Sequence, residues 1–437
     1  MASHEEPAAP LKLMPLTPFK PDLYERAWQS IPHPTLPLLA TAHQKSVTVF
    51  SLSTLSAHSS LTNGHERSVR STSWRPNLPP HKLSLITGSF DSSAGIWRWE
   101  DEGQGDSGND LEVEMTGGAK EDAEEKDWEL IVVLEGQKSE IKSVAFSPSG
   151  QYVATCGRDK TVWIWEDVGA SDDDDEWETV AVLEEHEGDV KCVTWCPDTN
   201  RSGRGRYSSD VLATTSYDDT VRIYREDEDG EWVCVAVLEG HKGTVWGAAW
   251  EPNPKTDHFP RLLTWSADRT IRVWTLKEED DEVEAPRHAF GGLRGIPNTM
   301  RRSLREEWRC TAILPAAHTR DIYSATWSAE TGRVASTGSD SIIAVYEEDA
   351  KGTATTEDEA AAELDGDVPM RNGDTKPAAS KQWKLLSTTP NAHGPYEVNH
   401  VTWCKRYDAG CAPEKRGVEE MLVTTGDDGF VRPWQIS

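Results

Sequence analysis

A short pattern recurs seven times along the 437-residue chain and constrains the fold more than any other feature. It is an aspartate followed six residues later by tryptophan or tyrosine, with alternating apolar residues between them. Six copies are Asp91–Trp97, Asp159–Trp165, Asp218–Tyr224, Asp268–Trp274, Asp340–Tyr346 and Asp428–Trp434. A degenerate copy, Gln44–Phe50, has glutamine in the aspartate position. Alternation with a period of two, bounded by Gly, Asp and Pro, predicts short β-strands.

A second pattern precedes most copies of the first. It is tryptophan, leucine six residues later and histidine three residues after that, followed by an apolar run that ends in an aromatic residue. The histidines are His65, His186, His241, His318 and His393, and Gln137 takes their place once. Each repeat therefore predicts about four strands, which is the content of one propeller blade. We expect an all-β, seven-bladed WD-repeat β-propeller, with residues 1–437 forming a single domain.

The two ends of the sequence complement each other. The last repeat stops at Trp434, too soon for an outer strand of its own, and the apolar stretch Leu11–Phe19 precedes the first repeat. We expect this N-terminal stretch to supply the missing strand and close the ring, because closure removes exposed strand edges.

The net charge of -30 is concentrated in acidic insertions. They lie near residues 101–127, 167–178, 277–307 and 347–382, mostly after the Trp/Tyr strand of a repeat. We interpret them as solvated loops between the third and outermost strands of blades. So acidic a chain is unsuited to direct nucleic-acid binding, which needs lysine and arginine, or to anionic membranes. No apolar run is long enough to predict a transmembrane helix.

The repeated polar residues resemble those of WD repeats, in which His, Ser/Thr, Asp and Trp form a hydrogen-bonded chain. A buried aspartate must be paired, and the histidines can supply donors. We therefore assign structural roles to the five histidines and to Asp91, Asp159, Asp218, Asp268, Asp340 and Asp428. Metal ligation by the histidines is the alternative, but they lie in separate blades. Blades with Gln44, Gln137, Tyr224 or Tyr346 are expected to lack the full chain.

Neither the cysteines nor any short motif indicates a metal centre or a catalytic site. Seven cysteines without framework spacing indicate a reducing compartment with free thiols. Cys192 and Cys196 are interpreted as core residues, since cluster ligation needs four thiolates in recognised spacing. We therefore expect no metal, no cofactor and no intrinsic iron–sulfur cluster. No P-loop, nucleophile elbow or zinc-protease motif is present, so we expect no enzymatic activity.

Three longer segments narrow the family. TCGRDKTVWIWE (155–166), TSYDDTVRIY (215–224) and EWVCVAVLEGHKGTVW (231–246) resemble the cytosolic iron–sulfur protein assembly WD-repeat family, and the similarity runs through all seven repeats. The resemblance implies a scaffold that joins a small assembly subunit and a HEAT-repeat subunit. It also implies contact with a hydrogenase-like iron–sulfur carrier and docking of apo iron–sulfur client proteins, in the cytoplasm and also in the nucleus.

The alternative is a WD-repeat adaptor in another complex, such as a ubiquitin ligase or a chromatin complex. Adaptors related to G-protein β subunits or to ubiquitin ligases normally carry an added N-terminal coiled coil or F-box. We expect no room for such an element before Leu11.

In WD propellers, the residue before the turn aspartate and two positions after the histidine form one face. Here the residues before the aspartate include Phe90, Arg158 and Tyr217, and those five after the histidine position include Arg70, Lys142, Lys191, Trp246 and Tyr323. Asn399 is the nearest equivalent in the last repeat. These nine residues are the predicted partner-binding surface, because arginine and aromatic side chains dominate interface energetics.

The expected ligand is an acidic and aromatic segment, for which a free C-terminal carboxylate is well suited. Arg158 is the first choice for the carboxylate because its guanidinium can bind two oxygens at once. The alternative is that Arg158 is solvated and paired with a neighbouring acid. Trp246 could instead cap the central channel. Asp189, Asp321 and Asp427 near this face are assigned to partner recognition rather than catalysis.

Overall fold

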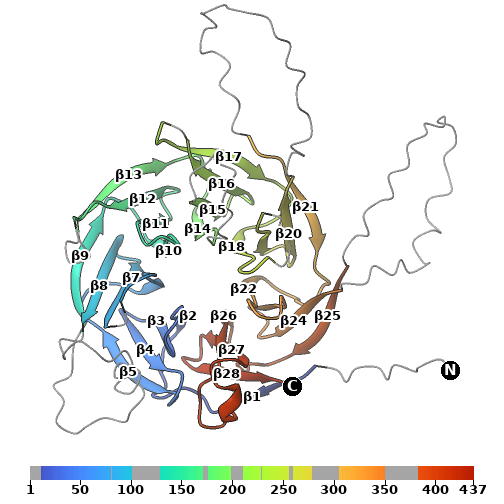
Figure 1. Ribbon diagram of the computed structural model, residues 1–437. Helices are drawn as coiled ribbons and strands as arrows, with labels where there is room; N and C mark the ends of the chain where they lie inside the picture. The colour runs from blue at the N-terminus through green and yellow to red at the C-terminus, as the bar shows by residue number, and fades with distance from the viewer. Residues whose placement is uncertain are drawn as a thin grey trace, which may run out of the picture.

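The computed structural model describes residues 11–79, 81–100, 128–170, 176–197, 210–227, 229–254, 259–277, 305–349 and 382–437. Within these ranges the chain forms seven four-stranded antiparallel sheets around a central axis (Figure 1). The prediction of a seven-bladed β-propeller is confirmed. The acidic insertion at 101–127 lies outside the described residues, as do those near 167–178, 277–307 and 347–382 except at their ends.

In blades 1 to 6 the strands follow one another in sequence from the axis outward (Figure 1). Blade 1 contains β2 (Ala27–Pro32), β3 (Leu38–His43), β4 (Ser46–Ser51) and β5 (Ser56–Leu61). Blade 2 contains β6 (Val69–Trp74), β7 (Lys82–Ser89), β8 (Ser93–Glu100) and β9 (Glu129–Glu135). Blade 3 contains β10 (Ile141–Phe146), β11 (Tyr152–Gly157), β12 (Val162–Asp167) and β13 (Trp177–Leu183).

Blades 4 to 6 repeat this order, and blade 7 departs from it in its outermost strand. Blade 4 contains β14 (Val190–Trp195), β15 (Val211–Ser216), β16 (Val221–Glu226) and β17 (Trp232–Leu238). Blade 5 contains β18 (Val245–Trp250), β19 (Leu262–Ser266), β20 (Ile271–Leu276) and β21 (Trp308–Ile313). Blade 6 contains β22 (Ile322–Trp327), β23 (Val334–Gly338), β24 (Ile343–Asp349) and β25 (Gln382–Thr389). Blade 7 contains β26 (Val398–Lys405), β27 (Glu420–Gly426), β28 (Val431–Ile436) and β1 (Leu13–Pro15), with the 3-10 turn η2 (Pro413–Lys415) between β26 and β27.

The ring is closed by the N-terminal strand, as the sequence predicts. β1 pairs antiparallel with β28, with Leu13 opposite Ile436 and Pro15 opposite Trp434. The pairing continues beyond the strands, because Leu16 donates its amide to the Pro433 carbonyl at 2.9 Å. The outer strand of the last blade therefore comes from the beginning of the chain.

The core lies between neighbouring blades. One cluster, for example, joins Val47 and Val49 of blade 1 to Trp74 and Trp97 of blade 2. The second strands of the blades are buried on both faces, so β3 reads LLATAH with every residue buried rather than alternating. Large aromatic side chains supply much of this buried area.

The innermost strands share a local irregularity that positions one side chain in every blade. In each of them the pairing register shifts between the first and third residues, which is a bulge at the second. A bulge re-aims the side chain of the extra residue. The seven second residues, which we call the channel mouth, are Trp28, Arg70, Lys142, Lys191, Trp246, Tyr323 and Asn399.

Candidate functional site

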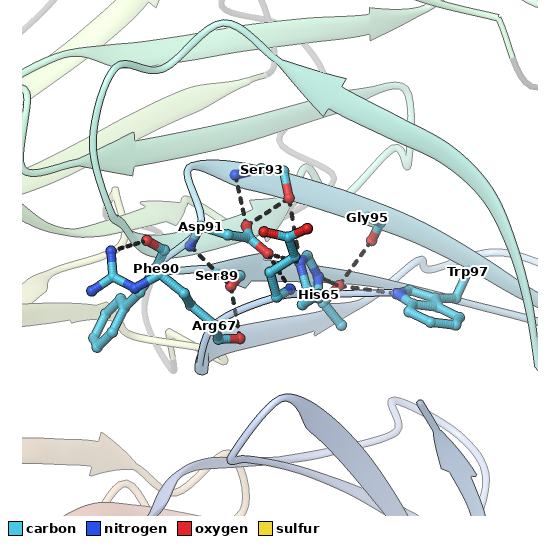
Figure 2. A network of polar contacts seen from close by, with 10 residues as sticks. His65, Arg67, Ser89, Phe90, Asp91, Ser93, Gly95 and Trp97 are labelled. Carbon is cyan, nitrogen blue, oxygen red and sulfur yellow. Dashed lines mark hydrogen bonds and ion pairs between the residues drawn. The ribbon is translucent and has the colours of Figure 1, made fainter. Parts of the chain in front are cut away.

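A hydrogen-bonded chain fixes the turn beside the channel mouth in blade 2 (Figure 2). The His65 ring contacts the Asp91 carboxylate at 3.0 Å through Nδ1 and the Thr87 hydroxyl at 2.7 Å through Nε2. Trp97 donates its indole N–H to the same hydroxyl at 2.9 Å. The turn aspartate is thereby tied to the middle of the blade.

The remaining four histidines make the same contact with their aspartates. The distances are 2.8 Å for His186 and Asp218, 3.0 Å for His241 and Asp268, 3.1 Å for His318 and Asp340, and 2.8 Å for His393 and Asp428. Burial alone would raise the pKa of these carboxyl groups. Hydrogen bonds from the histidine, a threonine and the backbone outweigh burial at Asp218 and Asp268, so their pKa lies well below the usual value.

The blades with Gln137 and Tyr224 lack part of this chain, whereas in the blade with Tyr346 the expectation is wrong, because Ser336 donates to the Tyr346 hydroxyl at 3.5 Å. Tyr224 donates its hydroxyl to Glu185 at 3.1 Å, whereas tryptophan in blade 2 donates to the central threonine. The Gln137 side-chain amide is buried and makes no hydrogen bond within the described ranges. Asp159 of that blade is held instead by the Lys138 amide at 2.7 Å and by Thr161.

We expect Gln137→His to stabilise the protein by about 1 kcal/mol, because an imidazole could bridge Asp159 and Thr155 where an amide now has no partner. The check is the midpoint of denaturant unfolding, followed by tryptophan fluorescence. Gln151→His, at an exposed position outside the chain, is the control. A midpoint equal to or below that of the wild type would contradict the expectation.

The residues before the turn aspartates lie in the turns between the second and third strands, and each is bonded to the residue just before the innermost strand of its blade. Arg158 donates its backbone N–H to the Glu140 carbonyl at 3.0 Å, and Tyr217 donates to Asp189 at 2.9 Å. The equivalent bond holds Phe90, Ala267, Ser339 and Asp427 in their blades. We call this side of the ring the top face; it carries the predicted residues and the channel mouth.

Cations and aromatic rings alternate across blades 1 to 5 of this face. The Arg70 guanidinium lies 4.9 Å from the centre of the Trp28 ring, and the Lys142 ammonium lies 4.3 Å from that of Phe90. The two rings contact each other edge to face, with 5.9 Å between centres. Lys191 lies 5.6 Å from the Tyr217 ring and 5.5 Å from that of Trp246. These are cation–π contacts, which hold a cation without neutralising it.

Arg158 is paired with a neighbouring carboxylate. Its guanidinium is 3.4 Å from Glu140, and Arg67 reaches the same carboxylate at 3.4 Å. The Arg158 side chain remains 62% exposed. Of the two alternatives for this residue, the geometry matches a solvated arginine paired with a neighbouring acid, and its free donors still face solvent.

On the other side of the channel mouth, Trp246, Tyr323 and Asn399 form contacts with neighbouring residues of the same face. Trp246 donates its indole N–H to Asp321 at 3.2 Å and packs edge to face on Tyr323. Asn399 donates to Asp427 at 2.8 Å. Burial, together with the nearby Glu397 and Asp321 carboxylates, raises the pKa of Tyr323 to about 12. The structure thus divides the nine predicted residues into a cationic part and a neutral part.

Sequence reasoning missed three residues of the top face: Arg26, Trp28 and Arg67. Arg26 forms an ion pair with Asp427 at 2.6 Å and lies 4.8 Å from the Trp28 ring. Blade 1 lacks the Gly-His pair from which the other positions are counted. The alternating stretch Ala27–Pro32 was the available signal, since aligning it with the other innermost strands puts Trp28 at the bulge.

Neither a metal site nor a membrane-spanning helix is found among the described residues. They contain no group of three or more His, Cys, Asp or Glu side chains arranged to hold a metal ion. Cys196 is buried, as expected of a core residue, whereas Cys192 is only half-buried on β14. No helix among the same residues is long and apolar enough to span a membrane.

Comparisons with known proteins identify the family. The family model of the WD domain, G-beta repeat, matches residues 128–166, 177–225 and 232–275. A Pyricularia oryzae protein described as a probable cytosolic iron-sulfur protein assembly protein 1 is 60% identical over 98% of this chain and 97% of its own length. Chaetomium globosum and Neurospora crassa proteins with the same description are 57% and 55% identical, over 98% of this chain and 97% and 96% of theirs. The chain belongs to the cytosolic iron-sulfur protein assembly protein 1 family.

Membership confirms the resemblance seen in the sequence. Each match to the WD family model starts near the outer strand of one blade and ends on the third strand of the next. Successive repeats of this family member therefore interlock, as β1 and β28 do at the closure of the ring.

Proposed function

We propose that this chain is a non-enzymatic scaffold of cytosolic iron–sulfur protein assembly, and that it docks apo client proteins on its top face. The relatives named above are described as cytosolic iron-sulfur protein assembly proteins, which supports the pathway and the compartment. The proposed partners are a small assembly subunit, a HEAT-repeat subunit and a hydrogenase-like iron–sulfur carrier. The WD propeller supports protein binding because its blades present repeated loops on one face.

One observation supports the top face as the docking surface. On a chain with a net charge of -30, cations and aromatic rings gather on the top face from Arg26 to Trp246. A cationic patch on an acidic body attracts anionic ligands locally. Exposed Tyr217 offers a ring for an aromatic partner residue, and arginine offers paired donors for a carboxylate. An acidic and aromatic chain terminus is the proposed ligand.

The test is affinity purification of the tagged full-length protein from its own cells, with wild type beside Arg158→Glu and Lys12→Glu. Lys12 is exposed near the ring closure, away from the top face, so its reversal controls for the change in net charge. We expect Arg158→Glu to keep the two assembly subunits and to reduce client recovery at least about tenfold, the effect of losing an interface hot spot. Co-purifying proteins are quantified by mass spectrometry.

Two results would contradict the proposal. If Arg158→Glu retains its clients as Lys12→Glu does, Arg158 is not part of the docking site. If the wild type recovers neither assembly subunit, the chain is an adaptor of another complex.

A further inference from the structure

Two cations at the channel mouth, Arg70 and Lys142, form no ion pair with any carboxylate of the described residues. Neither side chain forms an ion pair or donates a hydrogen bond to any described residue. Their closest contacts are the faces of Trp28 and Phe90. An arginine has five N–H donors and a lysine three, and a cation–π contact occupies few of them. On a chain with 75 acidic residues, this leaves charge and donors available to a ligand.

The neighbouring cations are each accompanied by a carboxylate. Lys191 lies 3.0 Å from Asp189, Arg26 pairs with Asp427, and Arg67 shares Glu140 with Arg158. Arg70 and Lys142 are therefore the two cations in this part of the mouth with no carboxylate in direct contact, although Glu140 and Asp189 act on Lys142 from a greater distance.

Both residues are half-buried at the bulges of adjacent innermost strands, β6 and β10. Loss of solvation lowers the pKa of Arg70 to about 10, and the nearby Arg26 adds to the effect. Burial also lowers the pKa of Lys142, as do Lys191 and Arg70, although Glu140 and Asp189 oppose them. Two cations that repel each other and are partly desolvated would be stabilised by a bound anion.

We propose that Arg70 and Lys142, from adjacent innermost strands, form a phosphate-binding site on the top face. A phosphate monoester carries a charge of about -1.5 to -2 at neutral pH, which matches two cations that form no ion pair better than a single carboxylate does. Arginine provides the bidentate fork for two phosphate oxygens, and lysine provides a point charge beside it. The phosphate can come from free inorganic phosphate or from a phosphorylated residue of a partner protein. The site does not depend on client docking, because a small anion suffices to fill it.

The test is isothermal titration calorimetry on the full chain at physiological ionic strength. The probes are inorganic phosphate and the peptide Gly-Gly-phosphoserine-Gly-Gly with both ends blocked, beside the unphosphorylated peptide. We expect one phosphate per chain and no binding of the unphosphorylated peptide. Arg70→Gln and Lys142→Gln should each weaken binding at least about tenfold, the effect of losing one charged hydrogen bond. Lys12→Gln removes the same charge elsewhere and should bind as the wild type does.

Two further variants distinguish loss of phosphate contacts from loss of stability and from changes at the proposed client site. Arg70→Lys retains the charge but loses the two-oxygen fork, so its affinity should fall between those of the wild type and Arg70→Gln, even if Arg70→Gln lowers the unfolding midpoint. Arg158→Gln should also stay within about threefold, because Glu140 already engages that side chain. This separates the phosphate site from the proposed client site.

The source of the phosphate follows from the ratio of the two affinities. A phosphopeptide that binds more than about tenfold tighter than inorganic phosphate supports a phosphorylated partner, since backbone contacts then add affinity. Equal or weaker binding of the peptide supports free phosphate. Absence of saturable phosphate binding to the wild type, or wild-type affinity in both glutamine variants, would overturn the proposal.

Discussion

Replacing His241 by alanine is expected to lower the free energy of unfolding by about 3 kcal/mol, one of the largest effects of a single substitution in this chain. The side chain is almost fully buried and links Asp268 at 3.0 Å to Thr264 at 2.8 Å. Alanine leaves a cavity and removes both hydrogen bonds at once. The midpoint of denaturant unfolding measures the loss, and His81→Ala, at an exposed position, is the control.

The effect of His241→Ala should depend on pH in a defined direction. The Asp268 pKa is depressed in the folded state, so the stability that its carboxylate contributes is present above its unfolded pKa of about 4 and is lost as the pH falls. The difference in the free energy of unfolding between wild type and variant should therefore become smaller below about pH 4. A difference that stays constant down to acid unfolding would mean that packing alone, and not the His241–Asp268 contact, stabilises this blade.

The number of blades and the ring closure could be predicted from the sequence because they depend on local chemistry. Each Asp-to-Trp copy requires a tight turn followed by a strand, and this requirement repeats whatever the neighbouring blades contain. Closure required only that the last repeat lacked a strand and that an apolar stretch preceded the first. The incomplete hydrogen-bonded chain of the blade with Gln137 was also predictable, since an amide cannot replace imidazole at that position with the same geometry.

The composition of the top face was predictable only in part. Counting from the histidines placed Arg70, Lys142 and Lys191 at the mouth, because the bulge recurs in each innermost strand. Spacing cannot show which of these cations a carboxylate neutralises. That depends on contacts between blades, such as the Arg67 and Arg158 pairs with Glu140, and on residues far apart in sequence, such as Trp28 and Phe90. Which of the arginines pair with a carboxylate therefore emerged only from the structure.

Removing residues 1–17, and with them β1, is expected to destabilise the propeller by about 4 kcal/mol or more and to cause association of the chains. The deletion removes the backbone bonds from Lys12 and Leu16 to the last strand, and it exposes the side of Trp434 that Leu13 covers. It also leaves β28 as an unpaired edge, which is a template for edge-to-edge pairing. Unfolding midpoints and light scattering after gel filtration measure the two effects, and removal of residues 1–9, which spares β1, is the control.

The two faces of β1 allow a sharper test of the same closure. Leu13 is 9% exposed and packs into the last blade, whereas the adjacent Met14 is 46% exposed. Leu13→Asp should therefore lower the midpoint strongly, because it buries a charge without a partner, and Met14→Asp should leave it nearly unchanged. Equal midpoints for the two variants would mean that β1 contributes backbone pairing alone. A deletion variant as stable as its control would mean that the three-stranded last blade is sufficient, and that the ring is held by the contacts of the innermost strands rather than by its N-terminal strand.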